Sequence, residues 1–115
     1  MCKEEGMTSF EEYGEFVNGM KIYPKHFAII YPALGLTGEA GEIAEKVKKV
    51  LRDNEGEWTD AAKAAVLDEL GDPLWYIAAL ADDLGYTLQD VIDNNVSKLT
   101  SRKSRGVLKG SGDAR

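Results

Sequence analysis

The chain has 115 residues, enough for one domain but not for several, so we expect residues 1–115 to fold as a single domain. Hydrophobic residues make up 43% and charged residues 30%, a composition that excludes a disordered polymer and indicates an ordinary globular protein. The net charge of −6 argues against duplex nucleic acid as a partner, because proteins bind it largely by neutralising phosphates.

The N-terminal segment holds the single cysteine, Cys2, and no apolar run of the kind found in secretory signals. One cysteine forms neither an intramolecular disulfide nor a multi-thiolate metal site, which fits a reducing compartment, so we expect a cytoplasmic protein. Thr8 and Glu11 have the spacing of a capping box, and the first helix is expected to run from about Ser9 to Met20.

Residues 21–35 interrupt the helical pattern with Pro24 and Pro32, yet they carry several aromatic side chains. We interpret this segment as a connector that could hold a short helix and line a pocket. His26, within the connector, is the only histidine of the chain, which excludes a zinc site or a ferritin-like di-iron site.

Two long helices are expected next, from about Ala33 to Arg52 and from Thr59 or Asp60 to about Leu84, with Gly85 as a C-cap. In the second of them the apolar residues at helical spacing, expected to face inward, are Ala62, Val66, Leu70, Leu74, Ile77, Ala81 and Leu84. The longest uncharged apolar run, residues 73–81, is far shorter than the ~20 residues of a membrane span, so we expect no membrane partner.

A fourth helix should begin at Thr87 and Asp90, which have capping-box spacing. Its inner face is expected to consist of Leu88, Val91, Ile92, Val96 and Leu99. The sequence therefore predicts an all-α, four-helix bundle-like fold. Because so short a helical chain leaves apolar surface uncovered, we expect oligomerisation to complete the core.

The charge is divided unevenly between the body and the C-terminal end. Residues 1–97 hold 8 basic and 19 acidic residues, a net charge of −11, whereas residues 98–115 hold six basic residues and one acidic residue, a net charge of +5. The glycine-rich tail from about residue 103 to 115 shows no periodicity. We expect this basic end to offset the negative field near a bound anion and the tail to fold over it as a lid.

Four carboxylates lie on the two long helices, Glu39 and Glu42 on the first and Glu69 and Asp72 on the second. Each pair is spaced i,i+3 and borders the apolar stripe of its helix, so packing of the stripes would bring all four together. The carboxylates of such a cluster repel one another unless a cation lies among them, and carboxylate oxygens suit Mg²⁺ or Mn²⁺. The alternative is two solvated faces of amphipathic helices.

Glycines beside these carboxylates favour the metal site over the solvated faces. Gly38 and Gly41 each cost about 1 kcal/mol relative to alanine inside a helix, and Gly71 lies between Glu69 and Asp72. We therefore expect another backbone or a ligand to approach closely at these positions.

The strings GLTGEAGEIAEKVKK and DELGDPLWYIAALADDLG resemble the ExxE and ExxD signature helices of the MazG-like, all-α nucleotide pyrophosphohydrolases. The string NNVSKLTSRKSRGVLKGSGDAR resembles the end of short, often phage-borne members, so the similarity covers most of residues 33–115. The resemblance implies that Glu39, Glu42, Glu69 and Asp72 bind Mg²⁺. The chain departs from the family pattern at Gly38, where a further glutamate is common, and at Pro73, which is expected to kink its helix.

Cationic and amide side chains near these segments are candidates for phosphate contact. They are Lys46, Lys49, Asn95, Lys98, Arg102 and Arg105. Lys46 and Lys49 extend the carboxylate face, although a Glu42–Lys46 surface pair would explain Lys46 equally well. The last four lie near the end of the fourth helix, where cations bind phosphate or simply stabilise the helix terminus. The resemblance favours phosphate contact by Lys98 and Arg102.

The resemblance implies a magnesium-dependent nucleoside triphosphate pyrophosphohydrolase that cleaves the α–β phosphoanhydride, yielding a nucleoside monophosphate and pyrophosphate. Water would attack with help from the metal, and Glu42 is our choice as general base. Two alternatives stay open. One is an enzyme of the same superfamily specific for dUTP, dCTP or phosphoribosyl-ATP, and the other is a non-catalytic helical module that binds nucleotide or metal. The resemblance also implies a homodimer or homotetramer.

Overall fold

The computed structural model describes residues 6–113 and 115. In these residues the chain forms four α-helices, a short 3-10 helix and no strand, so the all-α prediction is confirmed. The elements are α1 (Phe10–Met20), η1 (Lys25–Phe27), α2 (Ile30–Asp53), α3 (Asp60–Asp83) and α4 (Leu88–Ser104). Cys2 lies outside the described residues. No described helix is long and apolar enough to cross a membrane, and the cytoplasmic location stays a prediction.

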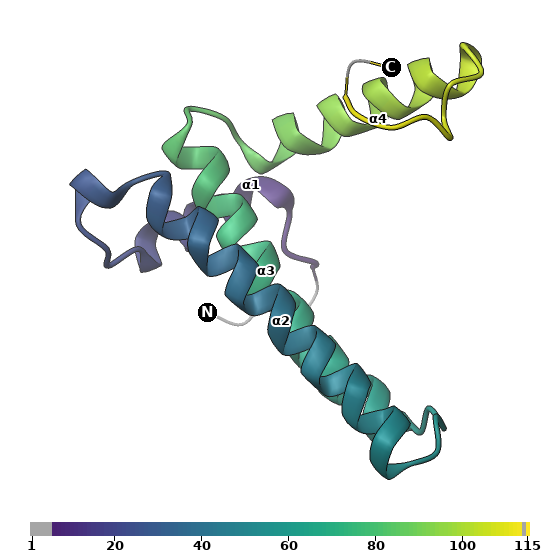
Figure 1. Cartoon of the computed structure of the whole chain (residues 1–115). Coiled ribbons are helices and arrows are strands. Elements are labelled where there is room, and N and C mark those ends of the chain that lie inside the picture. The colour runs from purple at the N-terminus through teal and green to yellow at the C-terminus, as the bar shows by residue number, and fades with distance from the viewer. Residues whose placement is uncertain (1–5, 114) are drawn as a thin grey trace.

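Helices α2 and α3 are antiparallel and pack against each other along their length (Figure 1). The turn between them contains Glu55 and Gly56, both with positive φ, and the Thr59 hydroxyl caps α3 by accepting a hydrogen bond from the Ala62 amide. Helix α2 begins three residues earlier than predicted. Pro32 is tolerated there because a first-turn residue has no helical acceptor for an amide proton. Helix α3 continues through Pro73.

Helix α1 packs on the second half of α3, where the core lies. Val17, Ala78, Ala79 and Leu88 form the buried cluster. The capping box of α1 consists of Ser9 and Glu12, one residue later than predicted. The sequence fits both registers, because Thr8 and Ser9 are each followed by a glutamate three residues later.

Helix α4 extends away from the α2–α3 pair (Figure 1). It contacts α1 and α3 near its start, where Leu88 is buried and Ile92 packs on the core. Gly85, with φ 88°, ends α3 as predicted, and the Tyr86 amide donates to the Ala81 carbonyl in the pattern of a Schellman motif. The radius of gyration is 17.2 Å, larger than the roughly 13 Å of a compact domain of this length, so the single chain is open.

This openness contradicts part of the predicted core. On α4, Val91, Val96 and Leu99 are exposed, because the helix leaves the body after its first turns. Leu70 and Leu74 on α3 and Leu84 at its C-cap were expected to face inward but are 49%, 42% and 52% exposed. The buried residues of α3 are the small side chains Ala78, Ala79 and Ala81, and all three lie in its second half.

Asp83, the last residue of α3, fixes the connector between α1 and α2. Its carboxylate is 8% exposed and accepts hydrogen bonds from Lys21 Nζ at 2.9 Å, Tyr23 Oη at 2.8 Å and the Ile29 amide at 2.9 Å. Burial alone raises the pKa of Asp83, but the bonds from Ile29, Lys21 and Tyr23 outweigh it and hold the pKa below its usual range. Burial and the bond to Asp83 raise the pKa of Tyr23 to about 12.

Ile29 is held in a strained conformation by the same contacts. Its φ of 72° and ψ of −54°, with an Ala28 carbonyl to Ile30 amide hydrogen bond of 2.8 Å, define a γ-turn of the rare kind with positive φ. Such a conformation costs about 1–3 kcal/mol for a β-branched residue and persists only when surrounding contacts enforce it. The bond from the Ile29 amide to Asp83 is one such contact.

We predict that Asp83→Asn lowers the free energy of unfolding by about 1–3 kcal/mol at pH 7, because buried donors lose a charged acceptor. The folded pKa of Asp83 lies below the unfolded value of about 3.9, so this stabilisation is present above about pH 4 and is lost as the pH falls through the folded pKa. Urea unfolding at pH 7 and at pH 3 measures the difference.

The matched control is Asp82→Asn, since Asp82 also binds Lys21 but its side chain is 47% exposed. We expect it to change stability by less than about 1 kcal/mol. An equal gap between the parent and Asp83→Asn at both pH values would contradict the charge-based explanation.

Candidate metal centre

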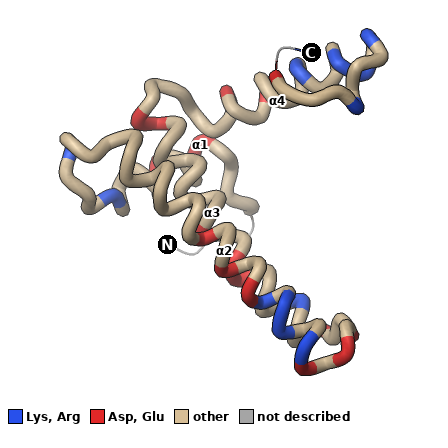
Figure 2. Tube along the Cα trace, viewed as in Figure 1, with Lys and Arg blue, Asp and Glu red and all other residues tan. Residues whose placement is uncertain are grey.

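Three of the four predicted carboxylates converge where α2 and α3 face each other. Glu39 on α2 and Glu69 and Asp72 on α3 each offer an oxygen that lies within 4.8 Å of the other two. Glu39 and Glu69 are partly buried, and Asp72 is exposed. Figure 2 shows acidic positions side by side on the two helices.

Glu42 lies one turn further along α2, is exposed and is not part of this three-carboxylate cluster. Its charge nevertheless acts on the cluster. Partial burial and the negative charges of Asp72, Glu42 and Glu69 raise the pKa of Glu39 above its ordinary value. The cluster is therefore under like-charge repulsion that a cation would relieve.

The geometry fits a hard divalent cation. Ligand oxygens of one octahedral Mg²⁺, each about 2.1 Å from the ion, lie roughly 3 to 4 Å apart, so small side-chain rotations bring the three oxygens into range. Three carboxylate ligands leave positions for water and for phosphate oxygens. The three clustered carboxylates thus fit Mg²⁺ or Mn²⁺.

Lys46 lies next to the cluster. Its Nζ is 3.9 Å from Glu69 Oε1, across the α2–α3 interface. The structure therefore pairs Lys46 with the facing helix rather than with Glu42, its alternative partner in the sequence. Lys49 is exposed one turn further along α2, and its charge helps to lower the pKa of Asp53 after the larger effect of Arg52.

The structure does not bring the basic end of the chain to the cluster. Figure 2 shows the basic positions of α4 and the tail well separated from the acidic α2–α3 region. Arg102 is 4% exposed and binds Asp113 at 2.7 Å, and Lys98 binds the same carboxylate at 3.3 Å. Arg105 binds the Ser101 hydroxyl and the Arg115 carbonyl, while Asn95 is exposed. Within one chain the tail folds back on α4, so the predicted lid over the carboxylates is not found.

A pocket of about 360 Å³ adjoins the carboxylate cluster and shares Glu39 and Asp72 with it. Tyr23, Tyr31, Trp75 and Tyr76 line it. The connector thus contains a short helix and lines a pocket, as predicted. His26 and Phe27 contact each other at a ring distance of 4.2 Å and are not part of this lining.

The glycines beside the carboxylates do not make the expected close backbone contacts within the chain. A Cβ atom at Gly38, Gly41 or Gly71 would meet nothing within 4 Å. The close contact is instead at Gly35, where a Cβ would lie less than 3.0 Å from the ring of Tyr76. Sequence reasoning missed Gly35, because only the facing helix reveals its role.

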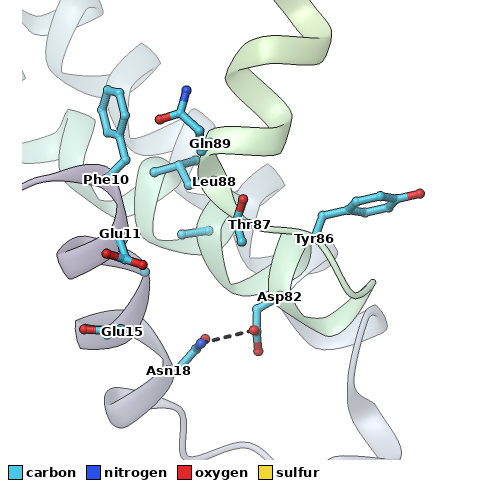
Figure 3. Close-up of a pocket in the computed structure, with 11 residues that line it drawn as sticks. Phe10, Glu11, Glu15, Asn18, Asp82, Tyr86, Thr87, Leu88 and Gln89 are labelled. Atoms are coloured by element: carbon cyan, nitrogen blue, oxygen red, sulfur yellow. Dashed lines mark hydrogen bonds between the residues drawn. The ribbon is translucent and has the colours of Figure 1, made fainter.

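A second cavity, of about 440 Å³, lies between α1 and the junction of α3 with α4 (Figure 3). Glu11, Glu15 and Asp82 give it an acidic lining, and Asn18 donates a hydrogen bond of 3.1 Å to Asp82. None of the three clustered carboxylates lines it. The aromatic pocket is therefore the cavity that adjoins the candidate metal centre.

Comparison with known proteins finds a family and two relatives that match much of the chain. A family profile described as "MazG nucleotide pyrophosphohydrolase domain" matches residues 32–107. The "Gene 37 protein" of Mycobacterium phage L5 is 53% identical over 85 residues, which cover 74% of this chain and 75% of that protein. The "Uncharacterized protein YvdC" of Bacillus subtilis (strain 168) is 38% identical over 72 residues, 58% of this chain and 68% of that protein. No solved structure matches the chain significantly.

We predict that Glu39→Gln raises the melting temperature in EDTA, because it removes one of the mutually repelling charges from the folded state. Excess Mg²⁺ should raise the melting temperature of the parent by several degrees and that of the variant by less, since the ion binds the folded chain. Differential scanning fluorimetry with and without Mg²⁺ makes the comparison.

Glu45→Gln is the control, because Glu45 lies on the same helix but forms an exposed pair with Lys48. We expect its response to Mg²⁺ to match that of the parent. The metal centre would lie elsewhere if Glu39→Gln gained as much stability from Mg²⁺ as the parent.

Proposed function

The chain belongs to the MazG nucleotide pyrophosphohydrolase family, and we propose that it is a magnesium-dependent nucleoside triphosphate pyrophosphohydrolase. The reaction would cleave the α–β phosphoanhydride and release a nucleoside monophosphate and pyrophosphate. The observation that carries this proposal is the convergence of Glu39, Glu69 and Asp72 on two facing helices. In this proposal the three carboxylates bind a cation beside a pocket large enough for part of a nucleotide, which Glu39 and Asp72 line.

In this proposal Glu39, Glu69 and Asp72 hold Mg²⁺, with Mn²⁺ as a possible substitute. The bound ion supplies charge neutralisation for the phosphates and activation of the attacking water. Glu42 is the general base, because it is exposed one turn from Glu39 and so is free to accept a proton from that water. Lys46, beside Glu69, and Lys49 beyond it extend the site with cations suited to the outer phosphates.

The remaining proposed phosphate contacts lie on α4 and at its C-cap: Asn95, Lys98, Arg102 and Arg105. Lys98 and Arg102 both donate hydrogen bonds to the Asp113 carboxylate, and this contact with an anionic oxygen supports the proposal. Because α4 extends away from its own carboxylate cluster, such contacts would be made to the site of another copy. We accordingly propose a homodimer or homotetramer.

The apolar surface of α3 supports this assembly. Leu67, Leu70 and Leu74 are spaced i, i+3 and i+7, which places them on one helix face, and their exposed fractions are 67%, 49% and 42%. A stripe of three half-exposed leucines beside the site is apolar surface of the kind that a second copy covers.

The proposed activity predicts pyrophosphate release from nucleoside triphosphates in the presence of Mg²⁺. Screening all ribo- and deoxynucleotides, with phosphoribosyl-ATP included, separates a broad enzyme from one specific for dUTP, dCTP or phosphoribosyl-ATP. Glu42→Gln should lower kcat by about 100-fold or more, because it removes the general base. Glu45→Gln, with an exposed carboxylate away from the cluster, should leave kcat within twofold of the parent.

Binding of nucleotide without pyrophosphate release from any substrate would favour the non-catalytic module. Full activity of Glu42→Gln would support the proposed hydrolase activity but contradict the role of Glu42 as its general base.

We predict that the parent has the mass of a dimer or tetramer by light scattering at micromolar concentration. Leu67→Glu should shift the mass toward the monomer, because it places a charge on the apolar stripe. Ala61→Glu, an exposed change of equal charge in the first turn of α3, should keep the parent mass. A monomeric parent would overturn the assembly.

A further inference from the structure

The aromatic pocket beside the carboxylates has walls from different parts of the chain. Tyr23 comes from the connector, Tyr31 from the first turn of α2, and Trp75 and Tyr76 from α3. At its edge lie Glu39 and Asp72 of the carboxylate cluster. This lining suits a ligand that joins an apolar ring to a group that binds a cation.

The rings are arranged for stacking. Tyr23 and Tyr31 are parallel within 17° at a centroid distance of 4.8 Å, and Tyr31 and Tyr76 lie 6.5 Å apart with an interplanar angle of 48°. Offset and tilted rings of this kind present π-faces to a planar heterocycle. Every nucleobase has such a face, so stacking tolerates several bases.

Asp83 holds the wall of this pocket that the connector forms. The connector is attached to α3 by three donors that converge on its carboxylate, namely Lys21, Tyr23 and the Ile29 amide. The Tyr23 bond fixes a ring that lines the pocket, and the Ile29 bond fixes the residue two positions before Tyr31. Both members of the stacked pair are therefore placed through Asp83.

The strained turn at Ile29 supports a positioning role. A β-branched residue in a γ-turn with φ 72° is held against its own preference, and backbone strain of this kind concentrates at functional sites. The turn directs the start of α2, where Tyr31 lies. On the opposite wall, Gly35 leaves the space that the Tyr76 ring occupies, so both walls depend on specific local geometry.

We propose that Asp83 is the positioning residue of the aromatic pocket, because it fixes Tyr23 and Ile29 and thereby the rings on which the base of a bound nucleotide stacks. The inference rests on the proposed function for the identity of the ligand. It goes beyond that function because it assigns the placement of the pocket wall to Asp83, which is not one of the four predicted metal ligands.

The test compares ligands with and without a base. Calorimetry in Mg²⁺ measures the dissociation constants of α,β-methylene deoxynucleoside triphosphates, which resist cleavage at the scissile bond, and of inorganic tripolyphosphate. Asp83→Ala should weaken binding of the nucleotide analogues at least tenfold, equivalent to about 1.4 kcal/mol, while binding of tripolyphosphate changes less than twofold.

Asp82→Ala is the matched control. Asp82 binds the same Lys21 at 2.6 Å, but its hydrogen bonds reach Asn18 rather than Tyr23 or the Ile29 amide. We expect both ligands to bind Asp82→Ala as they bind the parent. Equal losses for Asp82→Ala and Asp83→Ala, or equal losses for the two ligands, would overturn the proposal.

Circular dichroism shows whether Asp83→Ala folds. If it does not fold, Tyr23→Phe provides the test, because it keeps the ring. Tyr23→Phe removes only the hydroxyl that donates to Asp83, and a selective loss of at least threefold for the nucleotide analogues is expected. Unchanged affinity of Tyr23→Phe would refute positioning through Asp83 in that case.

The two proposals fail separately. A parent that binds the analogues through Asp83 but releases no pyrophosphate from natural nucleotides would refute the hydrolase and support the base subsite. A parent that releases pyrophosphate but shows no selective effect of Asp83→Ala would refute the subsite alone.

Discussion

The antiparallel pairing of α2 with α3 is the constraint on which the candidate site depends. Each helix has 24 residues, and the short turn between them fixes which residues face each other. The pairing brings Glu39 to Glu69 and Asp72, where burial and like charges raise the pKa of Glu39. Apolar packing along the rest of the pair thus sustains an unfavourable charge cluster. A cation would relieve that repulsion, so metal binding and stability of the helix pair are coupled.

Asp72 and Asp83 are aspartates of the same helix, but their different surroundings suit them to different roles. Asp72 is exposed among acidic side chains and is available to a ligand. Asp83 is almost fully buried among donors, which lower its pKa and satisfy its oxygens within the chain. Three turns of helix separate the acid placed to bind a cation from the acid that holds the pocket wall.

Local periodicity was sufficient to predict the four helices. The paired i,i+3 spacing predicted that Glu39, Glu69 and Asp72 come together, but it also placed Glu42 in the cluster, where the structure does not have it. The contacts of Asp83 were beyond such reasoning, because its partners Lys21, Tyr23 and Ile29 lie 54 to 62 residues away along the chain. The backbone conformation of Ile29 is even harder to predict, since a β-branched side chain disfavours positive φ and only the contact with Asp83 explains it. Leu70 has the pattern of a core residue, and helical spacing cannot tell whether its own chain or another covers it.

The open arrangement of α4 links the exposed apolar surface to the unfinished site. Lys46 is the cation that pairs with the clustered carboxylates among the described residues, and one ammonium group does not match the charge of a triphosphate. The basic residues that would match it lie on α4, where Arg102 and Lys98 share the carboxylate of Asp113. The leucine stripe of α3 is likewise left uncovered by its own chain. The carboxylates that lack cations and the leucines that lack cover both lie on the α2–α3 pair. A second copy bound there would therefore bury the leucines and bring cations to the carboxylates at the same time.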